Sequence, residues 1–212
     1  MSCCCSGSRT PRRASRTAFS STIRVDYSTG PPDTLIYAQN IAIRALTCYK
    51  KTVIAADEFR RALGHFATGV TTVTTLDADG RPTGLTASAF TSVSLDPPLI
   101  LVCVDHKSQS YPPLLERRRF GVNVLGLEQE AISKRFASTR LDKFDGVPHH
   151  VGELGVPLID GALAQLECVT VSTHVEGDHT IFVGRVERVH VGTGEPLIYY
   201  RGRYDRLSGA NS

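Results

Sequence analysis

The sequence predicts a mainly β protein, in which an antiparallel sheet of about seven strands closes on itself and short helices lie in the connections. Two observations favour this class over a doubly wound parallel sheet. Stretches rich in β-branched residues, such as 70–76 and 99–104, are separated by tight turns. In addition, the chain contains neither G-x-G-x-x-G nor G-x4-G-K-[ST], so a nucleotide would have to be held in another way.

The first expected element is an amphipathic helix. Asp57 is its expected N-cap, and Phe59, Leu63 and Phe66 form one apolar stripe, which normally packs on a core. The first half should continue with a strand over 70–76, a turn over 77–80, a strand from 83 to 95, a buried strand over 99–104, a polar loop over 106–110 and a helix over 113–119. The second half should contain a strand over 120–125, a helix over 128–136, an irregular segment, two long strands hinged at 176–178 and a last strand over 197–200.

The stretch 83–98 separates into two chemically different faces when it is read with the two-residue period of a strand. One face carries hydroxyls around an aromatic ring: Thr86, Ser88, Phe90, Ser92 and Ser94. The other is small and apolar enough to pack on a core: Ala87, Ala89, Thr91, Val93 and Leu95. The hydroxyl face suits a planar aromatic ligand with a phosphate, because hydroxyls donate to carbonyl and phosphate oxygens. An edge strand with a solvated Ser/Thr face is the alternative.

Composition and charge disfavour two classes of partner. The chain has 212 residues, of which 41% are hydrophobic, enough for one domain with a sizeable core. Residues 1–52 contain eight of its 24 Lys and Arg and two of its 21 Asp and Glu. Residues 53–212 are therefore slightly acidic, with 16 Lys and Arg against 19 Asp and Glu. Such a domain offers no nonspecific site for nucleic acid. No apolar run approaches the roughly 20 residues that span a bilayer, so no membrane partner is expected.

Cysteine usage indicates a reducing compartment. Three of the six cysteines are adjacent at 3–5, and Cys48, Cys103 and Cys168 stand alone, which is not the pattern of a disulfide framework. The chain has no Cys-x-x-Cys or His-x3-His spacing, so we expect no metal site. Cys103 and Cys168 are expected to be buried strand residues, and the protein is expected to be cytoplasmic.

The first 52 residues differ from the rest. They contain five Arg before the first acidic residue, Asp26, which resembles an organellar transit peptide. Met1 is nevertheless the only methionine, and the domain pattern starts abruptly after Lys51. We therefore expect 1–52 to be a disordered or wrongly assigned N-terminal extension, with translation starting near Val53, and 53–212 to be the domain. An intact mass from the native host that includes the extension would contradict a start at Val53.

Six motifs in one order resemble a known family. They are FATGVTTVTT, GLTASAFTSVSLDPPLILVCV, FGVNVL, GVPLIDGALAQLEC, GDHTIFVGRV and LIYYRGRY, within a span from Ala55 to Leu207. Together they resemble the short-chain flavin reductases. The resemblance implies an FMN-binding split β-barrel (a Greek-key antiparallel barrel) in a homodimer with flavin sites near the interface. It also implies NADH- or NADPH-dependent reduction of free FMN or FAD, which supplies reduced flavin to a separate flavin-dependent monooxygenase.

By the same resemblance, two segments and a pair of residues hold the flavin. The segment along the ring comprises Thr86, Ser88, Ala89, Phe90, Thr91, Ser92 and Ser94, with Ser92 or Ser94 towards the phosphate. The phosphate loop comprises Lys107, Ser108, Gln109 and Ser110, where a cation would make charge-assisted bonds. Arg135 and Phe136 match a further contacting pair, although Arg-Phe at a helix end is also typical of a cation that complements the helix dipole beside a core aromatic.

The resemblance places the nicotinamide beside His179, the candidate catalytic residue. Gly177 permits a tight turn, and Asp178 would stabilise that turn or orient the imidazole, whereas a lone His in a hairpin is usually structural or exposed. A terminal element near both cofactors comprises Tyr199, Tyr200, Arg201 and Gly202. His149 and His150 stand where relatives often carry an aromatic or an Arg, so neither receives a role.

The implied chemistry is hydride transfer from nicotinamide C4 to flavin N5. It needs two rings stacked with reacting atoms about 3–3.5 Å apart, rather than a nucleophile or a metal. Three alternatives stay open: an oxidase of the pyridoxamine-phosphate type that holds FMN permanently, a non-catalytic flavin- or haem-binding module, and a hydrolase using Cys168 and His174. Colourless protein that consumes NADH only when free flavin is added would favour the reductase.

Overall fold

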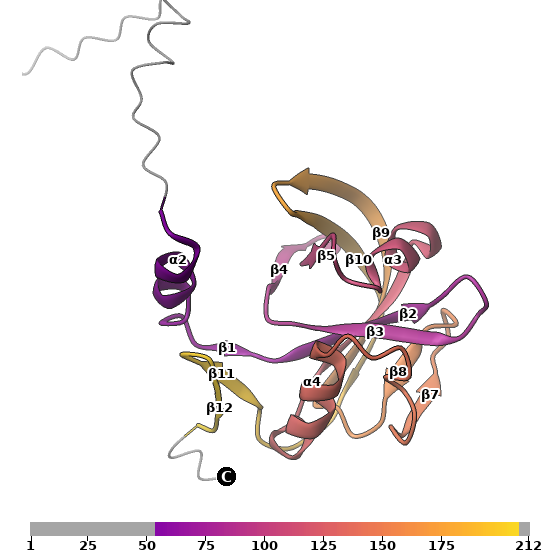
Figure 1. Ribbon diagram of the computed structural model, residues 1–212. Coiled ribbons are helices and arrows are strands. Elements are labelled where there is room, and N and C mark those ends of the chain that lie inside the picture. Colours follow the sequence, from indigo (N-terminus) through magenta and orange to yellow (C-terminus); the bar gives the residue numbers. More distant parts are fainter. Residues whose placement is uncertain (1–53, 208–212) are drawn as a thin grey trace, which may run out of the picture. The chain divides into compact units, whose positions relative to one another are not determined.

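The computed structural model describes residues 54–207, so the extension expected over 1–52 lies outside the described residues, as does Cys48. Seven strands form one antiparallel sheet in the order β3-β2-β6-β9-β10-β5-β4 (Figure 1). In chain order they are β2 (Thr71–Leu76), β3 (Pro82–Ala87), β4 (Phe90–Leu95), β5 (Pro98–Asp105), β6 (Arg119–Val124), β9 (Ala164–Glu176) and β10 (His179–Val191). The mainly β, antiparallel prediction is confirmed.

The single strand predicted from 83 to 95 is wrong. The chain breaks at Ser88 and Ala89 and passes from β3, at one edge of the sheet, to β4, at the other, and no hydrogen-bonded ladder joins these two edges within residues 54–207. The alternation therefore does not continue across the break. Phe90 packs against the core, whereas Leu95, which was expected on the core face, is 93% exposed.

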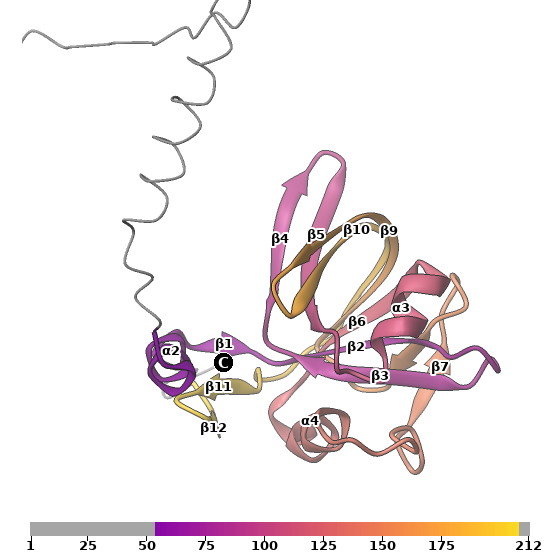
Figure 2. The same ribbon diagram turned by 45° about the horizontal axis from the view of Figure 1, so that its top comes forward.

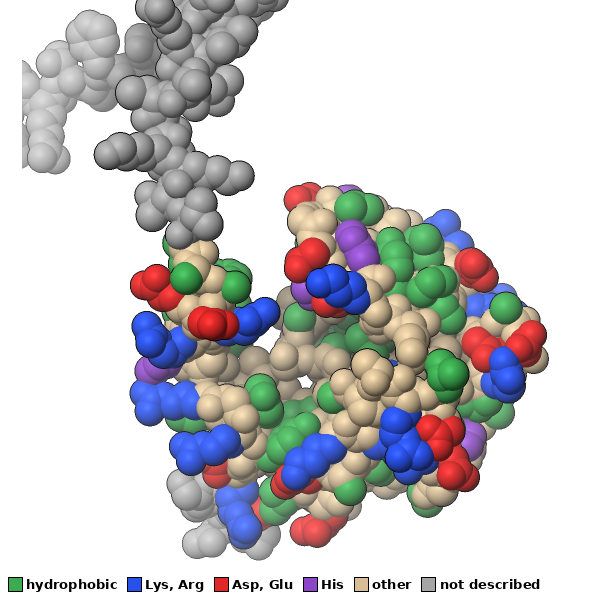
Figure 3. Space-filling model, viewed as in Figure 1, with side chains coloured by type: hydrophobic (Ala, Val, Ile, Leu, Met, Phe, Trp, Pro, Cys, Tyr) green, Lys and Arg blue, Asp and Glu red, His purple; other side chains and the backbone are tan. Residues whose placement is uncertain are grey.

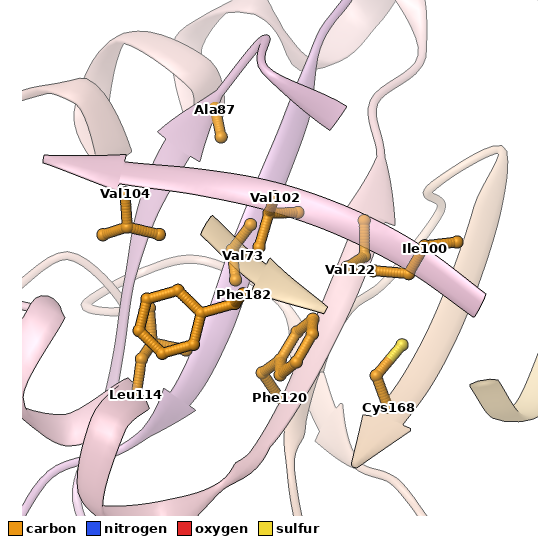
Figure 4. Packing of buried hydrophobic residues seen from close by; sticks show 10 residues of the cluster. All are labelled: Val73, Ala87, Ile100, Val102, Val104, Leu114, Phe120, Val122, Cys168 and Phe182. Atoms are coloured by element: carbon orange, nitrogen blue, oxygen red, sulfur yellow. The ribbon is translucent and has the colours of Figure 1, made fainter. Parts of the chain in front are cut away.

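The core is an apolar cluster inside the curved sheet (Figure 4). On β5 only alternate residues are buried, among them Val102 and Val104, because one face of this strand meets the core. Cys103 lies between them and is only partly buried, so its predicted burial is wrong in degree, whereas Cys168 is fully buried. Gly184 of β10 allows a close approach, since a Cβ there would lie 2.5 Å from Cζ of Phe120.

Short helices and strands complete the fold. The helices are α2 (Ala56–Leu63), α3 (Tyr111–Arg117), the 3-10 turn η1 (Leu127–Gln129) and α4 (Glu130–Ala137). The strands β1 (Thr68–Gly69), β11 (Ile198–Tyr200) and β12 (Arg203–Asp205) form a small sheet, and β7 (His149–Val151) pairs with β8 (Pro157–Ile159). The helix predicted over 113–119 begins two residues earlier, because prolines fit a first turn whose N–H groups need no partner. No helix within residues 54–207 is long and apolar enough to cross a bilayer.

The elements α2, β1, β11 and β12 together form what we call the terminal lobe (Figure 2). The N-cap of α2 is Ala55, without a side-chain cap, so the expectation for Asp57 is wrong. The predicted stripe exists but is not covered: Phe59 is 54% exposed, Leu63 56% and Phe66 76%. No residue of α2 is buried, so the helix has an apolar face that lacks a partner within residues 54–207.

Candidate functional site

The C-terminal end of β5 brings three predicted segments together. The N–H of Cys103 donates to the carbonyl oxygen of Ala89 at 3.1 Å, which places the β3–β4 connection beside β5. The N–H of His106 donates to the carbonyl oxygen of Asp178 at 3.0 Å, which joins the loop 106–110 to the turn between β9 and β10. The β3–β4 connection at Ser88 and Ala89, the phosphate loop and His179 therefore lie at one end of the sheet, whereas Ser92 and Ser94 lie on β4 opposite Ile100 and Leu99, towards the other end of β5.

The predicted flavin segment is largely open to solvent. Its exposed members are Ser88, Ala89, Thr91 and Ser92, and Ser94 is partly exposed. Thr86 is different, because its hydroxyl donates to the carbonyl oxygen of Ser133 at 2.7 Å and so anchors α4 on β3. Phe90 packs against the core. The structure thus leaves the hydroxyls of Ser88 and Ser92 available to a ligand and uses that of Thr86 internally.

The phosphate loop has an exposed and a buried end. Lys107 and Gln109 are exposed and Ser108 is partly exposed. None of the ion pairs within residues 54–207 involves Lys107, so its charge is available to an anion. Ser110 is buried, and its hydroxyl donates to the carbonyl oxygen of Gly84 at 2.8 Å. Ser110 therefore fixes the loop to β3 rather than offering a free donor.

His179 stands at the start of β10, just after the turn. Gly177 has a φ of 62°, the left-handed conformation that glycine adopts readily. Nδ1 of His179 lies 2.7 Å from Oδ1 of Asp178, and this hydrogen bond holds the pKa of the Asp178 carboxyl below its usual value. Asp178 therefore orients the imidazole, as predicted. The His179 side chain is 43% exposed, and its Nε2 edge is the one left to a ligand.

Arg135 and Phe136 are committed to packing. Phe136 is buried and meets Phe144 edge to face, with ring centroids 4.9 Å apart. Nε of Arg135 donates to the carbonyl oxygen of Lys143, and Nη2 donates to that of Asp142, both at 2.8 Å. The structural interpretation of this pair is therefore favoured over a flavin contact.

The residues Tyr199, Tyr200, Arg201 and Gly202 lie in the terminal lobe. Arg201 and Gly202, with φ of 48° and 78°, form the turn from β11 into β12, a strand that the sequence did not predict. The Arg201 guanidinium lies 5.3 Å from the centroid of Tyr200. No hydrogen bond or ion pair within residues 54–207 joins this group to His179, and the surface is hollowed between the lobe and the sheet (Figure 3).

Two cavities of about 310 and 460 Å³ lie elsewhere. The first lies beside η1, the second between β7 and the far ends of β9 and β10, and neither is lined by a predicted site residue. The candidate site, by contrast, exposes Ser88, Ser92 and Lys107 to solvent. Such a surface suits a ligand that must leave after reaction.

The hydrolase alternative does not fit the structure. Cys168 is fully buried, and burial raises the pKa of its thiol to about 12, so it supplies no thiolate near neutral pH. His174 lies six residues along the same strand. At about 3.3 Å per residue that separation is roughly 20 Å, far beyond hydrogen-bond reach.

Two groups of residues near the site carry no signal in the sequence. Lys143 is buried, donates from Nζ to the carbonyl oxygens of Gly84 at 2.9 Å and Phe136 at 3.1 Å, and has a pKa lowered by burial. A lysine in an irregular segment is normally exposed, so nothing in the sequence marked it. The second group is His106 with Thr180. Each is the direct neighbour of a predicted site residue, Lys107 or His179, but a lone His or Thr carries no signal of its own.

Comparisons with known proteins agree on one family. A model of the flavin reductase-like domain matches residues 63–208. An NADH-dependent flavin reductase of a Rhodococcus species is 43% identical over 150 residues, covering 70% of this chain and 84% of that protein. The reductase component of 4-nitrophenol 4-monooxygenase/4-nitrocatechol 2-monooxygenase of Rhodococcus opacus is 44% identical over 147 residues, covering 69% and 78%. The NADH:FAD oxidoreductase SgcE6 of Streptomyces globisporus C-1027, solved with NAD and FAD fragments, superposes with a TM-score of 0.70 at 40% identity, covering 74% and 94%.

Proposed function

The chain belongs to the flavin reductase-like family, and we propose that this flavin reductase oxidises NADH and supplies reduced flavin to a separate monooxygenase. The similarity to an NADH-dependent flavin reductase supports the choice of NADH, and the similarity to a reductase component supports the oxygenase partner. The observation that carries the proposal is that three features lie at one end of the sheet: the exposed β3–β4 connection with Ser88, the exposed cation Lys107 and the partly exposed His179. We further propose that residues 53–212 form the catalytic domain and that its curved sheet is a split β-barrel.

The residues at this end fit a flavin and a pyridine nucleotide. Lys107 would bind a phosphate, because a cation strengthens hydrogen bonds to anionic oxygens. Ser88 and Ser92 would donate to the polar edge of the flavin ring or to its phosphate tail. When bound, the two groups supply the chemistry, a hydride passing from nicotinamide C4 to flavin N5. The role of the chain is to bind and orient them, with His179 held by Asp178 on the nucleotide side.

The openness of the site supports flavin as an exchanging substrate rather than a permanent group. A permanently held cofactor is usually enclosed over most of its surface. Here Ser88, Ser92 and Lys107 are all exposed. This favours a reductase over an oxidase of the pyridoxamine-phosphate type.

We also propose that the protein is a homodimer. The apolar stripe on α2 is uncovered, and Val93 and Leu95 on the edge strand β4 are 50% and 93% exposed. Uncovered apolar area of this kind on one chain is typical of an interface. The unpaired cysteines Cys103 and Cys168 fit a cytoplasmic protein.

A cofactor matrix tests the function directly. Purified protein should be colourless and should oxidise NADH only when FMN or FAD is added, and rates with NADH, NADPH, FMN and FAD should identify the preferred pair. Yellow protein that consumes NADH without added flavin would favour the oxidase. A protein that binds flavin but never consumes NADH would contradict both enzymes.

A pair of variants tests the residue assignment. Ser92→Ala combined with Lys107→Ala should raise the KM for flavin by at least about tenfold, since a lost charged hydrogen bond costs about 1.5–3 kcal/mol, and should change the KM for NADH little. Lys134→Ala is the matched control, because Lys134 is an exposed lysine on α4 that pairs with Glu130. Equal effects on the two KM values would argue against a phosphate at Lys107.

A further inference from the structure

A partly buried hydrogen-bond chain runs beside the proposed site. Nε2 of His106 lies 2.9 Å from Oγ1 of Thr180, and Thr180 donates its hydroxyl proton to the Tyr111 oxygen at 3.1 Å. Thr180 is fully buried. When Thr180 gives its one hydroxyl proton to Tyr111, its oxygen accepts from His106, and the imidazole then carries a proton on Nε2.

The same histidine is tied to the fold at two more points. Its N–H donates to the carbonyl oxygen of Asp178 at 3.0 Å. Its ring lies against Tyr111, with centroids 4.9 Å apart, and Tyr111 packs edge to face on Phe182 in the core at 6.1 Å. His106 is thus connected to the turn of β9 and β10, to the first residue of α3 and, through Tyr111, to the core.

His106 stands between the two halves of the site. It directly precedes Lys107, the residue proposed for the phosphate, and its partner Thr180 directly follows His179, the residue proposed for the nucleotide side. Neither Lys107 nor His179 has a side-chain bond to the other within residues 54–207. Besides the main-chain pairing, two side-chain bonds of Thr180, to His106 and to Tyr111, hold the two halves at one spacing.

Building on the proposed function, we propose that His106 is a positioning residue that fixes the loop 107–110 to the turn 177–179. Hydride transfer requires both rings at near contact distance, so their two anchors must not move apart. His106 need touch neither ligand. Its removal should therefore weaken the use of both substrates, whereas Lys107→Ala should affect flavin and His179→Ala should affect the nucleotide.

Substitutions at His106 separate this role from general packing. The side-chain nitrogen of glutamine reaches the position of Nε2, whereas that of asparagine reaches only the position of Nδ1. His106→Ala and His106→Asn should each raise the KM for flavin and the KM for NADH about fivefold, the effect of one lost hydrogen bond. His106→Gln should stay within about twofold of the wild type for both. His190→Ala, an exposed histidine near the other end of β10, is the control and should change neither.

Thr180→Val supplies an independent test, because valine keeps the shape of threonine and removes the hydroxyl that accepts from His106. It should raise both KM values at least as much as His106→Ala does, because it removes the His106 bond and also the Thr180–Tyr111 bond. The double variant should be no worse than Thr180→Val alone, since that variant already lacks the His106 bond. A change in one KM only, equal values for the Gln and Asn variants, or additive single effects would overturn the proposal. If His106→Ala does not fold by thermal melting, the comparison of Gln with Asn decides. A wild-type protein without flavin-dependent NADH oxidation would instead overturn the proposed function.

Discussion

The uncovered stripe of α2 makes the proposed dimer testable by a double substitution. Phe59→Ser with Leu63→Ser removes two apolar side chains from the stripe and leaves the sheet unchanged. An eight-residue helix with no buried residue has little stability of its own in water. If a second copy covers the stripe, the substitution should separate the dimer.

The size of the effect follows from exposure. Complete burial of a Leu or Phe side chain contributes about 1.5–3 kcal/mol. Phe59 is 54% exposed and Leu63 56%, so covering each in a dimer contributes about half of that, roughly 1.2 kcal/mol. A two-fold dimer buries the pair twice, which brings the loss to about 5 kcal/mol and raises the dissociation constant by more than about a thousandfold.

Sedimentation velocity across a concentration series measures this constant directly. The wild type should sediment as a dimer and the double variant as a monomer at the same micromolar concentration. Arg61→Ser is the matched control, because it places a serine on the same helix away from the stripe. A double variant that stays dimeric with an unchanged dissociation constant would refute the assignment of the stripe to the interface.

Replacing His179 with alanine should lower kcat/KM for NADH roughly tenfold through the loss of one polar contact, and unchanged steady-state kinetics would remove His179 from the site. Gly184→Ala should lower the free energy of unfolding by about 1–3 kcal/mol in urea titrations, because the new Cβ would meet Phe120 at 2.5 Å, and an unchanged midpoint would contradict this packing. Cys168 should resist iodoacetamide at about pH 8.5 until the protein is unfolded, as judged by peptide mapping. Because burial raises its folded pKa from 9.0 to about 12, its contribution to stability should be complete below about pH 9 and should decline as the pH rises towards 12.

Local patterns in the sequence predicted most of the elements. The strand over 70–76, the turn at 77–80 and the hinge at 176–178 all lie where expected, because β-branched runs and the residues of tight turns act over a few neighbouring positions. The prediction of one strand from 83 to 95 was wrong because the break in this strand depends on distant parts of the chain. A passage from one edge of a sheet to the other depends on the positions of β2 and β5, which no window of sixteen residues contains.

The candidate site also has features that the sequence predicted and features that it did not. The motifs indicated the flavin segment, the loop of Lys107 and the orientation of His179 by Asp178, because each depends on residues that are adjacent in the chain. The sequence did not indicate that Thr86 and Ser110 use their hydroxyls internally or that Lys143 is buried. Those bonds join residues far apart in the chain.

By itself, the sequence determined the antiparallel class and the family, and it predicted a set of residues for a flavin and a nucleotide. Only the tertiary structure decided which of those groups are exposed, that His106 and Thr180 are hydrogen-bonded, and that no part of residues 54–207 covers the apolar stripe of α2. The physical reason is that composition and periodicity specify what a segment can bury or donate. The partner that it actually meets is specified by contacts between distant strands.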